Sequence, residues 1–138
     1  MYYIKFIMRS NLFKLAKYLY YLSLVALLIL YLFPGSLLGL FLYGNSDQQP
    51  NIIKNPIGTS INHLFFFIYL SVLGFFNRLK KKERINSFKF LFCISILLEF
   101  THWLIPKRAF EYYDLFGNVM GVIIAYLLIN FFLKMKIK

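Results

Sequence analysis

Long apolar runs separated by short polar segments dominate the hydrophobic pattern of this chain. Four runs approach the roughly 20 residues that an α-helix needs to cross the hydrocarbon core of a bilayer. They cover residues 15–33, 61–76, 88–105 and 113–133. The runs do not alternate apolar and polar residues as the wall of a β-barrel does, and a helix satisfies its backbone groups within one segment. The pattern predicts an all-α, four-span transmembrane helix bundle, formed as a single domain by residues 1–138.

Breaks in the pattern delimit these runs. Pro34-Gly35 ends the first run, and SLLGLFLY after it either lies at the membrane interface or extends the span through a kink. Residues 44–60 are polar and contain proline and glycine, which predicts a loop. The basic N-terminal segment with its apolar core resembles a signal sequence, but no small-x-small cleavage site follows. We therefore expect an uncleaved membrane span.

Composition and charge support a membrane location and predict an orientation. The chain is 60% hydrophobic and 15% charged, whereas soluble domains average about 25% charged residues. Thirteen of its 16 lysines and arginines lie before or at the start of the first run, between the second run and the start of the third, or after the fourth. By the positive-inside rule, we expect both termini to be cytoplasmic. Because these cations flank apolar runs, we expect the lipid bilayer as their partner and no nucleic acid.

The chemistry-bearing side chains of the apolar runs gather at their predicted outer ends. The candidate binding residues are His63, Glu99, His102, Arg108, Asp114 and Asn118. Glu99 and His102 are three residues apart and share one helix face, and Asp114 and Asn118, four apart, share another. A charged group within the bilayer costs about 2.5–3.5 kcal/mol on insertion scales. Glu99 therefore needs a partner, with Arg108, His63 and His102 as candidates, or it is protonated.

Small residues and the single cysteine carry less chemistry. Gly117, Gly121 and Ala125 form a row of small side chains, which favours close helix packing and also offers a contact for a homo-oligomer. Cys93 has no second cysteine for an internal disulfide and no partners at metal-ligand spacing. The two histidines and five acids show no recognised ligand spacing either. We expect no metal and no cofactor.

The outer-end residues fall at the spacing of a known signature, that of the VanZ-like family of small bacterial membrane proteins. The chain resembles it in Glu99, Pro106, Arg108, Asp114, Asn118 and Gly121, with His102 in the place of the usual glutamine. A second signature, Asp-Lys-x-x-His followed by aromatic residues, resembles TSINHLFFF, in which Thr59 and Ser60 replace the Asp-Lys pair and His63 takes the histidine place. The family is named for a protein associated with resistance to the glycopeptide antibiotic teicoplanin. The resemblance implies a location in the bacterial inner (cytoplasmic) membrane, a cell-envelope role and, by extension, a role in glycopeptide resistance.

Three functions fit these residues. In the first, an outer-leaflet polar pocket binds the head group of an envelope lipid or an amphiphilic antibiotic, with Arg108 on a phosphate or carboxylate. In the second, a membrane enzyme modifies a lipid-linked or cell-wall substrate through acid–base chemistry of the catalytic candidates Glu99 and His102. In the third, the polar residues tie the helices together and bind no ligand.

Overall fold

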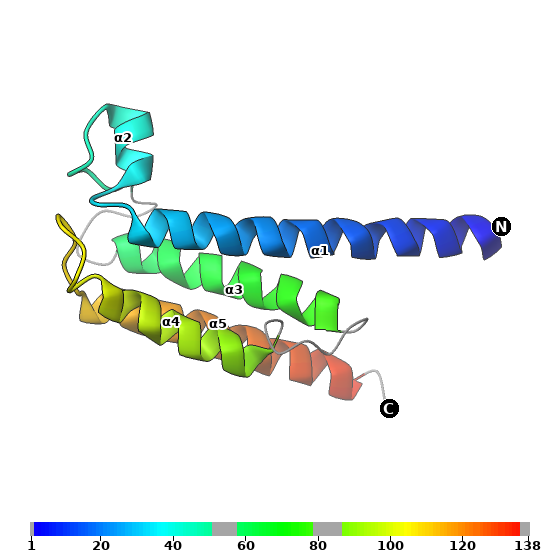
Figure 1. Ribbon diagram of the computed structural model, residues 1–138. Helices are drawn as coiled ribbons and strands as arrows, with labels where there is room; N and C mark the ends of the chain where they lie inside the picture. The colour runs from blue at the N-terminus through cyan, green and yellow to red at the C-terminus, as the bar shows by residue number, and fades with distance from the viewer. Residues whose placement is uncertain (1, 51–57, 79–86, 136–138) are drawn as a thin grey trace.

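The computed structural model describes residues 2–50, 58–78 and 87–135 (Figure 1). Five helices occupy these ranges: α1 (Tyr2–Leu32), α2 (Leu37–Tyr43), α3 (Gly58–Arg78), α4 (Phe88–Thr101) and α5 (Tyr112–Met135). No strand occurs in the described ranges. The predicted all-α class is confirmed.

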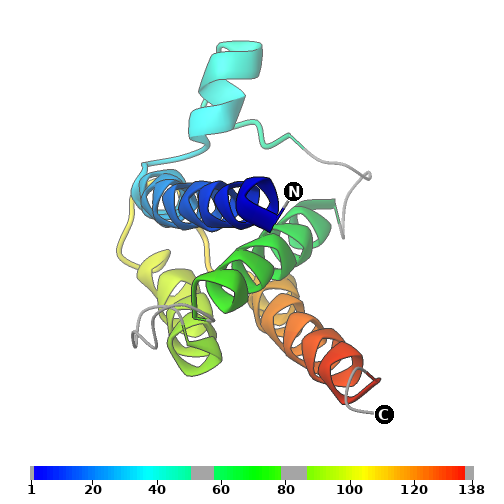
Figure 2. The same ribbon diagram turned by 90° about the vertical axis from the view of Figure 1, so that its right-hand side faces the viewer.

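Four of the helices form the bundle and run in alternating directions. In Figures 1 and 2, α1, α3, α4 and α5 lie side by side, and the start of α1 and the end of α5 lie toward one end. Helix α3 occupies the middle of the bundle, because it packs against α5 most extensively and also against α1 and α4. We call the opposite end, where α1 and α4 end and α3 and α5 begin, the loop end. The predicted polar residues therefore converge there.

Three helical segments are long and apolar enough to cross a membrane, namely Asn11–Leu32, Ser60–Arg78 and Tyr112–Met135. The third predicted span, residues 88–105, is helical only as far as Thr101. The N–H groups of residues 102–104 bond to carbonyls three residues earlier, which tightens the chain into a turn. Pro106 disfavours the helical conformation at the residue before it. The 14 residues of α4 rise about 21 Å, less than the roughly 30 Å of a bilayer core.

The apolar segment after Pro34-Gly35 is a separate helix, α2, rather than an extension of α1. The Ser36 hydroxyl accepts a hydrogen bond from the Gly39 N–H at 2.9 Å and begins the helix. Gly44 ends it in the left-handed conformation, with φ of 68°. Helix α2 projects from the loop end away from the other helices (Figures 1 and 2). Several of its large apolar side chains, including Phe41, are exposed.

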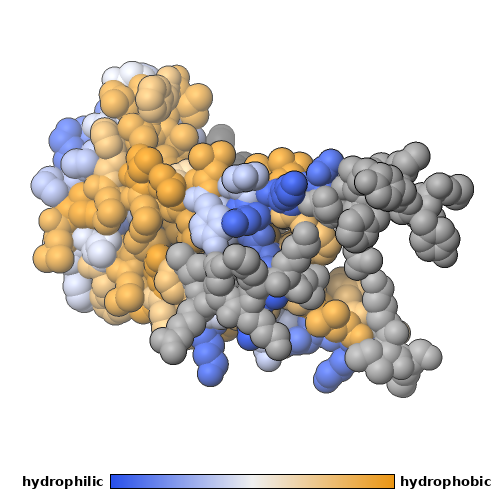
Figure 3. Space-filling model, turned by 45° about the vertical axis from the view of Figure 1, so that its right-hand side comes forward, coloured by the Kyte–Doolittle hydropathy of each residue, from blue (hydrophilic) through white to orange (hydrophobic). Residues whose placement is uncertain are grey.

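The exterior of the bundle is apolar. Large hydrophobic side chains are exposed along α1, α3, α4 and α5, as at Leu22, Leu97 and Phe131. Figure 3 shows apolar residues over most of the described surface on one face, with hydrophilic residues at the loop end and toward the termini. Soluble monomers rarely expose apolar patches larger than a few hundred Å². This surface is that of a membrane-type protein.

The small-residue row of α5 packs inside the chain. A Cβ atom added at Gly117 would collide with the backbone of Ser60, and one added at Gly121 would lie 2.6 Å from the Leu64 carbonyl oxygen. Ala125 is fully buried. The predicted packing role is confirmed, since α3 and α5 approach along this row. A homo-oligomer stays a prediction and would need another surface.

Candidate functional site

The predicted site residues lie together at the loop end, and most of them are buried. Glu99 and Asn118 are fully buried, and His102 and Asp114 are no more than 5% exposed. Two residues that the sequence pattern did not single out, Tyr31 on α1 and Ser60 on α3, bond to this group. We call the following set the polar cluster: Tyr31, Ser60, His63, Glu99, His102, Asp114 and Asn118. The polar cluster brings α1, α3, α4 and α5 together.

Asn118 forms the centre of the polar cluster. Its Oδ1 accepts a hydrogen bond from the Tyr31 hydroxyl at 2.7 Å and lies 3.1 Å from His63 Nδ1. Its Nδ2 donates to the Ser95 carbonyl at 3.3 Å and to Glu99 Oε2 at 3.4 Å. One amide side chain on α5 therefore contacts polar groups of the three other bundle helices.

Glu99 contacts three groups: His102 at the end of α4, Glu111 just before α5, and Asn118 on α5. Oε1 lies 3.2 Å from His102 Nδ1 and accepts the Glu111 backbone N–H at 3.1 Å. The predicted shared face of Glu99 and His102 is confirmed by this contact. Together with the Asn118 amide, three donors surround the carboxylate, as a buried acid requires. Arg108, the expected partner from the loop, does not pair with Glu99.

Asp114 and His63 form the second acid–histidine pair. The Ser60 hydroxyl donates to Asp114 Oδ1 at 2.6 Å, and His63 Nε2 lies 3.8 Å from Asp114 Oδ2. Asp114 is in the first turn of α5, where a helix N-terminus favours negative charge. Among the described ion pairs, none joins Asp114 to Arg108.

Arg108 binds backbone rather than carboxylate. Its Nη2 donates to the Leu30 carbonyl at 2.6 Å and its Nε to the Phe33 carbonyl at 3.3 Å. These carbonyls belong to the C-terminal end of α1, which attracts cations. Burial lowers the pKa of Arg108, and Tyr31 is the first of the neighbours that raise it. The guanidinium keeps its charge, since arginine does not lose its proton in proteins.

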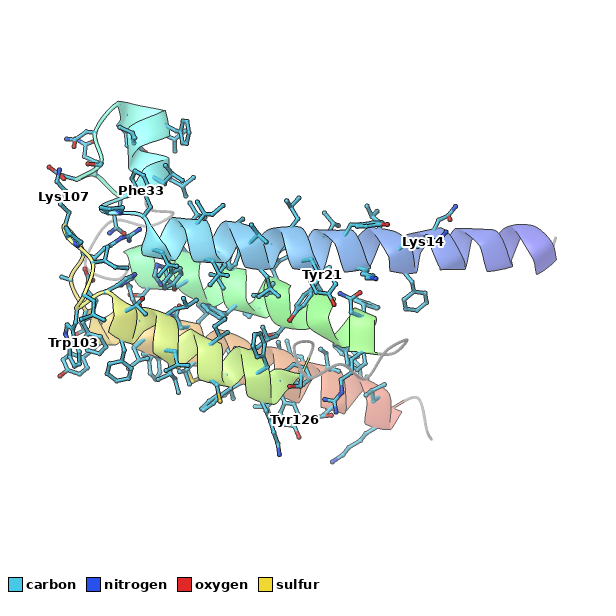
Figure 4. All side chains as sticks on the ribbon, in the orientation of Figure 1. Lys14, Tyr21, Phe33, Trp103, Lys107 and Tyr126 are labelled. Carbon is cyan, nitrogen blue, oxygen red and sulfur yellow. The ribbon has the colours of Figure 1, made fainter. Side chains whose placement is uncertain are left out.

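Lys107 has the same charge as its neighbour Arg108 but differs from it in exposure and in its partners. It lies exposed at the tip of the segment between α4 and α5 (Figure 4). Its Nζ is 3.4 Å from Asp47 Oδ1, and both side chains are more than half exposed. An exposed ion pair of this kind contributes little to stability. Lys107 therefore belongs to the surface and not to the polar cluster.

A cavity of about 140 Å³ opens beside the polar cluster, between the end of α1, the start of α2 and the first turns of α3. Its apolar walls include Leu27, Leu30, Phe66 and Phe67. Seven polar residues also line it, namely Tyr31, Ser36, Gln49, Asn62, His63, His102 and Arg108. Glu99, Asp114 and Asn118 are not among the lining residues. The structure thus separates the predicted site into a closed network and an open cavity that meet at the two histidines.

The residues that sequence reasoning missed had weak signals. Tyr31 is one of eleven tyrosines in the chain and carries no charge, so nothing in the pattern distinguishes it, yet it is buried at the loop end beside His63. Its ring stacks on that of His102 with centroids 5.2 Å apart. Ser60 precedes His63 by three residues and so shares its face. Among the described residues, no group of three or more His, Cys, Asp or Glu side chains is placed to hold a metal ion.

These features define a class, that of all-helical membrane-type proteins with a buried acid–histidine network at one end. Within that class, the chain belongs to the VanZ/LLP1 family, whose model matches residues 3–133, nearly the whole chain. The match confirms the resemblance seen in the signature residues. Comparison with curated proteins and with solved structures finds no match.

Proposed function

We propose that this protein binds the anionic head group of an envelope lipid in the cavity at its loop end. The observation that carries the proposal is Arg108, which lines the cavity and is only partly exposed. It forms no ion pair with a described carboxylate. A cation removed from water is costly unless it is paired, and a phosphate or carboxylate matches a guanidinium geometrically.

The apolar walls of the cavity suit the rest of a lipid. Leu27 and Leu30 on α1 face Phe66 and Phe67 on α3 across the same space. A lipid head group carries its charge next to hydrocarbon, so this combination of one cation and apolar walls matches it. Ligand sites are commonly apolar with a few convergent polar groups.

The size of the cavity favours a head group over a whole antibiotic. Its volume of about 140 Å³ compares with about 30 Å³ for one water molecule in the liquid. A phosphate with a small polar substituent fits such a space, and a glycopeptide antibiotic is far larger. Teicoplanin is the second ligand to test, because the family is named for a protein associated with resistance to it.

The enzyme alternative has one observation in its favour. Glu99 does not line the cavity. His102 does line it, and His102 also bonds to Glu99. A carboxylate–histidine pair is a common acid–base arrangement. Analysis of the bound lipid for a cleaved or altered head group tests this alternative alongside binding.

The membrane arrangement follows from the bundle and the charges. We propose four spans with both termini cytoplasmic, which puts the loop end at the outer leaflet of a bacterial inner membrane. The alternating helix directions and the grouping of 13 of the 16 basic residues toward one side support this orientation. For the short α4, the turn after it extends the span, with the exposed Trp103 and Leu104 at the interface.

Neighbouring cations provide a matched test of the head-group site. The full-length protein and its Arg108→Gln and Lys107→Gln variants are titrated in detergent with phosphatidylglycerol and with phosphatidylcholine, and bound lipid is counted by native mass spectrometry. Loss of charge-assisted hydrogen bonds costs about 1.5–3 kcal/mol. We therefore expect Arg108→Gln to weaken phosphatidylglycerol binding by about tenfold or more.

The Lys107→Gln variant removes the same charge from the surface and should bind within about twofold of the original protein, as surface pairs are worth little. Equal binding of phosphatidylglycerol by the Arg108→Gln variant, at unchanged helix content, would refute the head-group site.

A further inference from the structure

One nitrogen of His102 is buried beside the cavity with no hydrogen-bond partner. The residue is 3% exposed, and its Nε2 contacts no donor or acceptor within the described part of the chain. The ring also lines the cavity. Buried polar atoms in native proteins are almost always paired with protein, water or ligand. An unpaired nitrogen on a ring that lines the cavity is a candidate partner for a polar group of a bound ligand.

The surroundings of Glu99 determine what this nitrogen offers. The carboxylate already accepts the Glu111 backbone N–H and the Asn118 amide, and it faces His102 Nδ1 at 3.2 Å. An ionised carboxylate can only accept hydrogen bonds, so the proton between the two groups is on His102 Nδ1, which donates to Glu99. In a neutral imidazole the other nitrogen is then an acceptor. With His102 neutral, Nε2 consequently carries a lone pair, on a ring that lines the cavity.

The same cavity presents a donor of fixed charge. Arg108 uses Nη2 and Nε on carbonyls of α1, which leaves other N–H groups of its five for a ligand. A ligand that satisfies both walls carries an anion for Arg108 and a hydrogen-bond donor for His102. A phosphodiester alone supplies only the first.

We infer that the cavity selects a hydroxyl-bearing phosphodiester head group, with the phosphate on Arg108 and a hydroxyl donating to His102 Nε2. This inference rests on the proposed function and adds the chemical class of the ligand. A phosphoglycerol head group has this chemistry. Its carbons contact the apolar walls near Leu27 and Phe67.

The test compares two lipids that differ only in hydroxyl groups. Phosphatidylglycerol and phosphatidylpropanol have the same phosphodiester, charge and three head-group carbons, but phosphatidylpropanol has no hydroxyl in its head group. A hydrogen bond between neutral groups is worth about 1 kcal/mol, so the full-length protein should bind phosphatidylglycerol about fivefold more tightly. The measurement is the same native mass spectrometry titration in detergent. Equal affinities would overturn the inference.

Two variants locate the effect at His102. In His102→Asn, the shorter amide keeps a donor for Glu99 and removes the acceptor at the cavity, so the preference between the two lipids should fall to about one. In His102→Gln, the longer amide reaches the cavity and should retain the preference. A preference that survives in a folded His102→Asn protein would also overturn the inference. If that variant does not fold, the two-lipid comparison with the unaltered chain decides.

Failure of the inference is distinguishable from failure of the proposed function. If phosphatidylcholine binds as tightly as both anionic lipids, the head-group site itself is wrong. If both anionic lipids bind tightly and equally, only the hydroxyl selection is wrong. Glycerophosphoglycerol, the head group without acyl chains, separates the sources of the ligand. Competition by it at concentrations similar to the lipid supports a soluble ligand, and competition only by the intact lipid supports a membrane ligand.

Discussion

At the scale of single residues, the polar cluster replaces isolated charges with a network in which each group has partners. Asn118 joins Tyr31, Ser95 and Glu99, and Ser60 bonds to Asp114. Buried polar groups cost free energy chiefly when they are left unpaired. The network therefore fixes the helix ends that form one wall of the cavity.

Replacement of the central amide should lower stability. In Asn118→Ala, Tyr31 and Glu99 each lose a buried partner, which we expect to lower the free energy of unfolding by about 1–3 kcal/mol. Asn77 provides the matched control, because it is buried toward the other end of α3 and makes one long bond of 3.5 Å to the Ala16 carbonyl. Denaturant unfolding in detergent, followed by circular dichroism, measures both. A smaller loss for Asn118→Ala than for Asn77→Ala would contradict the central role.

Glu111, at the start of α5, gives a pH dependence. Burial raises its pKa, and the nearby carboxylates of Asp114 and Glu99 raise it further. The folded state therefore holds this proton more tightly than the unfolded state does, and stability falls as the pH rises through the raised pKa. Glu111→Gln removes the ionisation. Its unfolding temperature should equal that of the original protein at acid pH and exceed it above the pKa of Glu111.

The control for this pH effect is Asp47→Asn. This change removes an exposed carboxylate that contacts Lys107 Nζ and the Ser46 hydroxyl. Its difference from the original protein should not follow the same pH range. A pH profile for Glu111→Gln that runs parallel to that of the original protein would show that the shift has no effect on folding.

At the scale of elements, close packing of α3 on α5 sets the positions of the site residues. Gly117 and Gly121 allow α5 to approach the backbone of α3, and Asp114 and Asn118 lie on the same helix next to this contact. Helix α2 contributes differently, since Leu37 and Leu38 line the cavity while Phe41 and Leu42 are exposed. Its apolar outer side fits the interface of the membrane.

The α3–α5 contact predicts an unusual effect of alanine. An exposed Gly→Ala change inside a helix stabilises it by about 1 kcal/mol. At Gly121, the new Cβ would lie 2.6 Å from the Leu64 carbonyl oxygen and 2.8 Å from Phe67 Cβ, so the helices must move apart. We expect Gly121→Ala to lower the free energy of unfolding by about 1–3 kcal/mol. Leu127→Ala on the exposed side of α5 should have a smaller effect, and unfolding of both variants in detergent measures the difference.

At the scale of the whole molecule, polar and charged groups lie at both ends of an apolar bundle. The loop end holds the polar cluster, Arg108 and the cavity, and the other end holds exposed basic residues such as Lys14 and Arg78 (Figures 3 and 4). This division is what a chain needs if its middle is in hydrocarbon. The cavity then opens at the level of lipid head groups.

Reporter fusions test the orientation. With four spans and cytoplasmic termini, a green fluorescent protein fused after Lys138 should fluoresce, and alkaline phosphatase fused there should be inactive. Phosphatase fused after residue 110, between α4 and α5, should be active. The opposite pattern would put the loop end in the cytoplasm, and activity at both positions would remove a span.

The sequence by itself determined the helices and the group of residues that meet. Run lengths and breaks locate α1, α3 and α5, because backbone hydrogen bonding in hydrocarbon requires helices, and spacing places Glu99 with His102. Only the tertiary structure decided the pairing and the cavity. Arg108 reaches carbonyls of α1 rather than Glu99, because the turn after α4 carries it across to the end of that helix. Tyr31 contributes to the site through the packing of α1 on α3 and α5, and α2 contributes through the folding of the segment after Pro34. Contacts between residues so far apart in the chain leave no periodic signal in it.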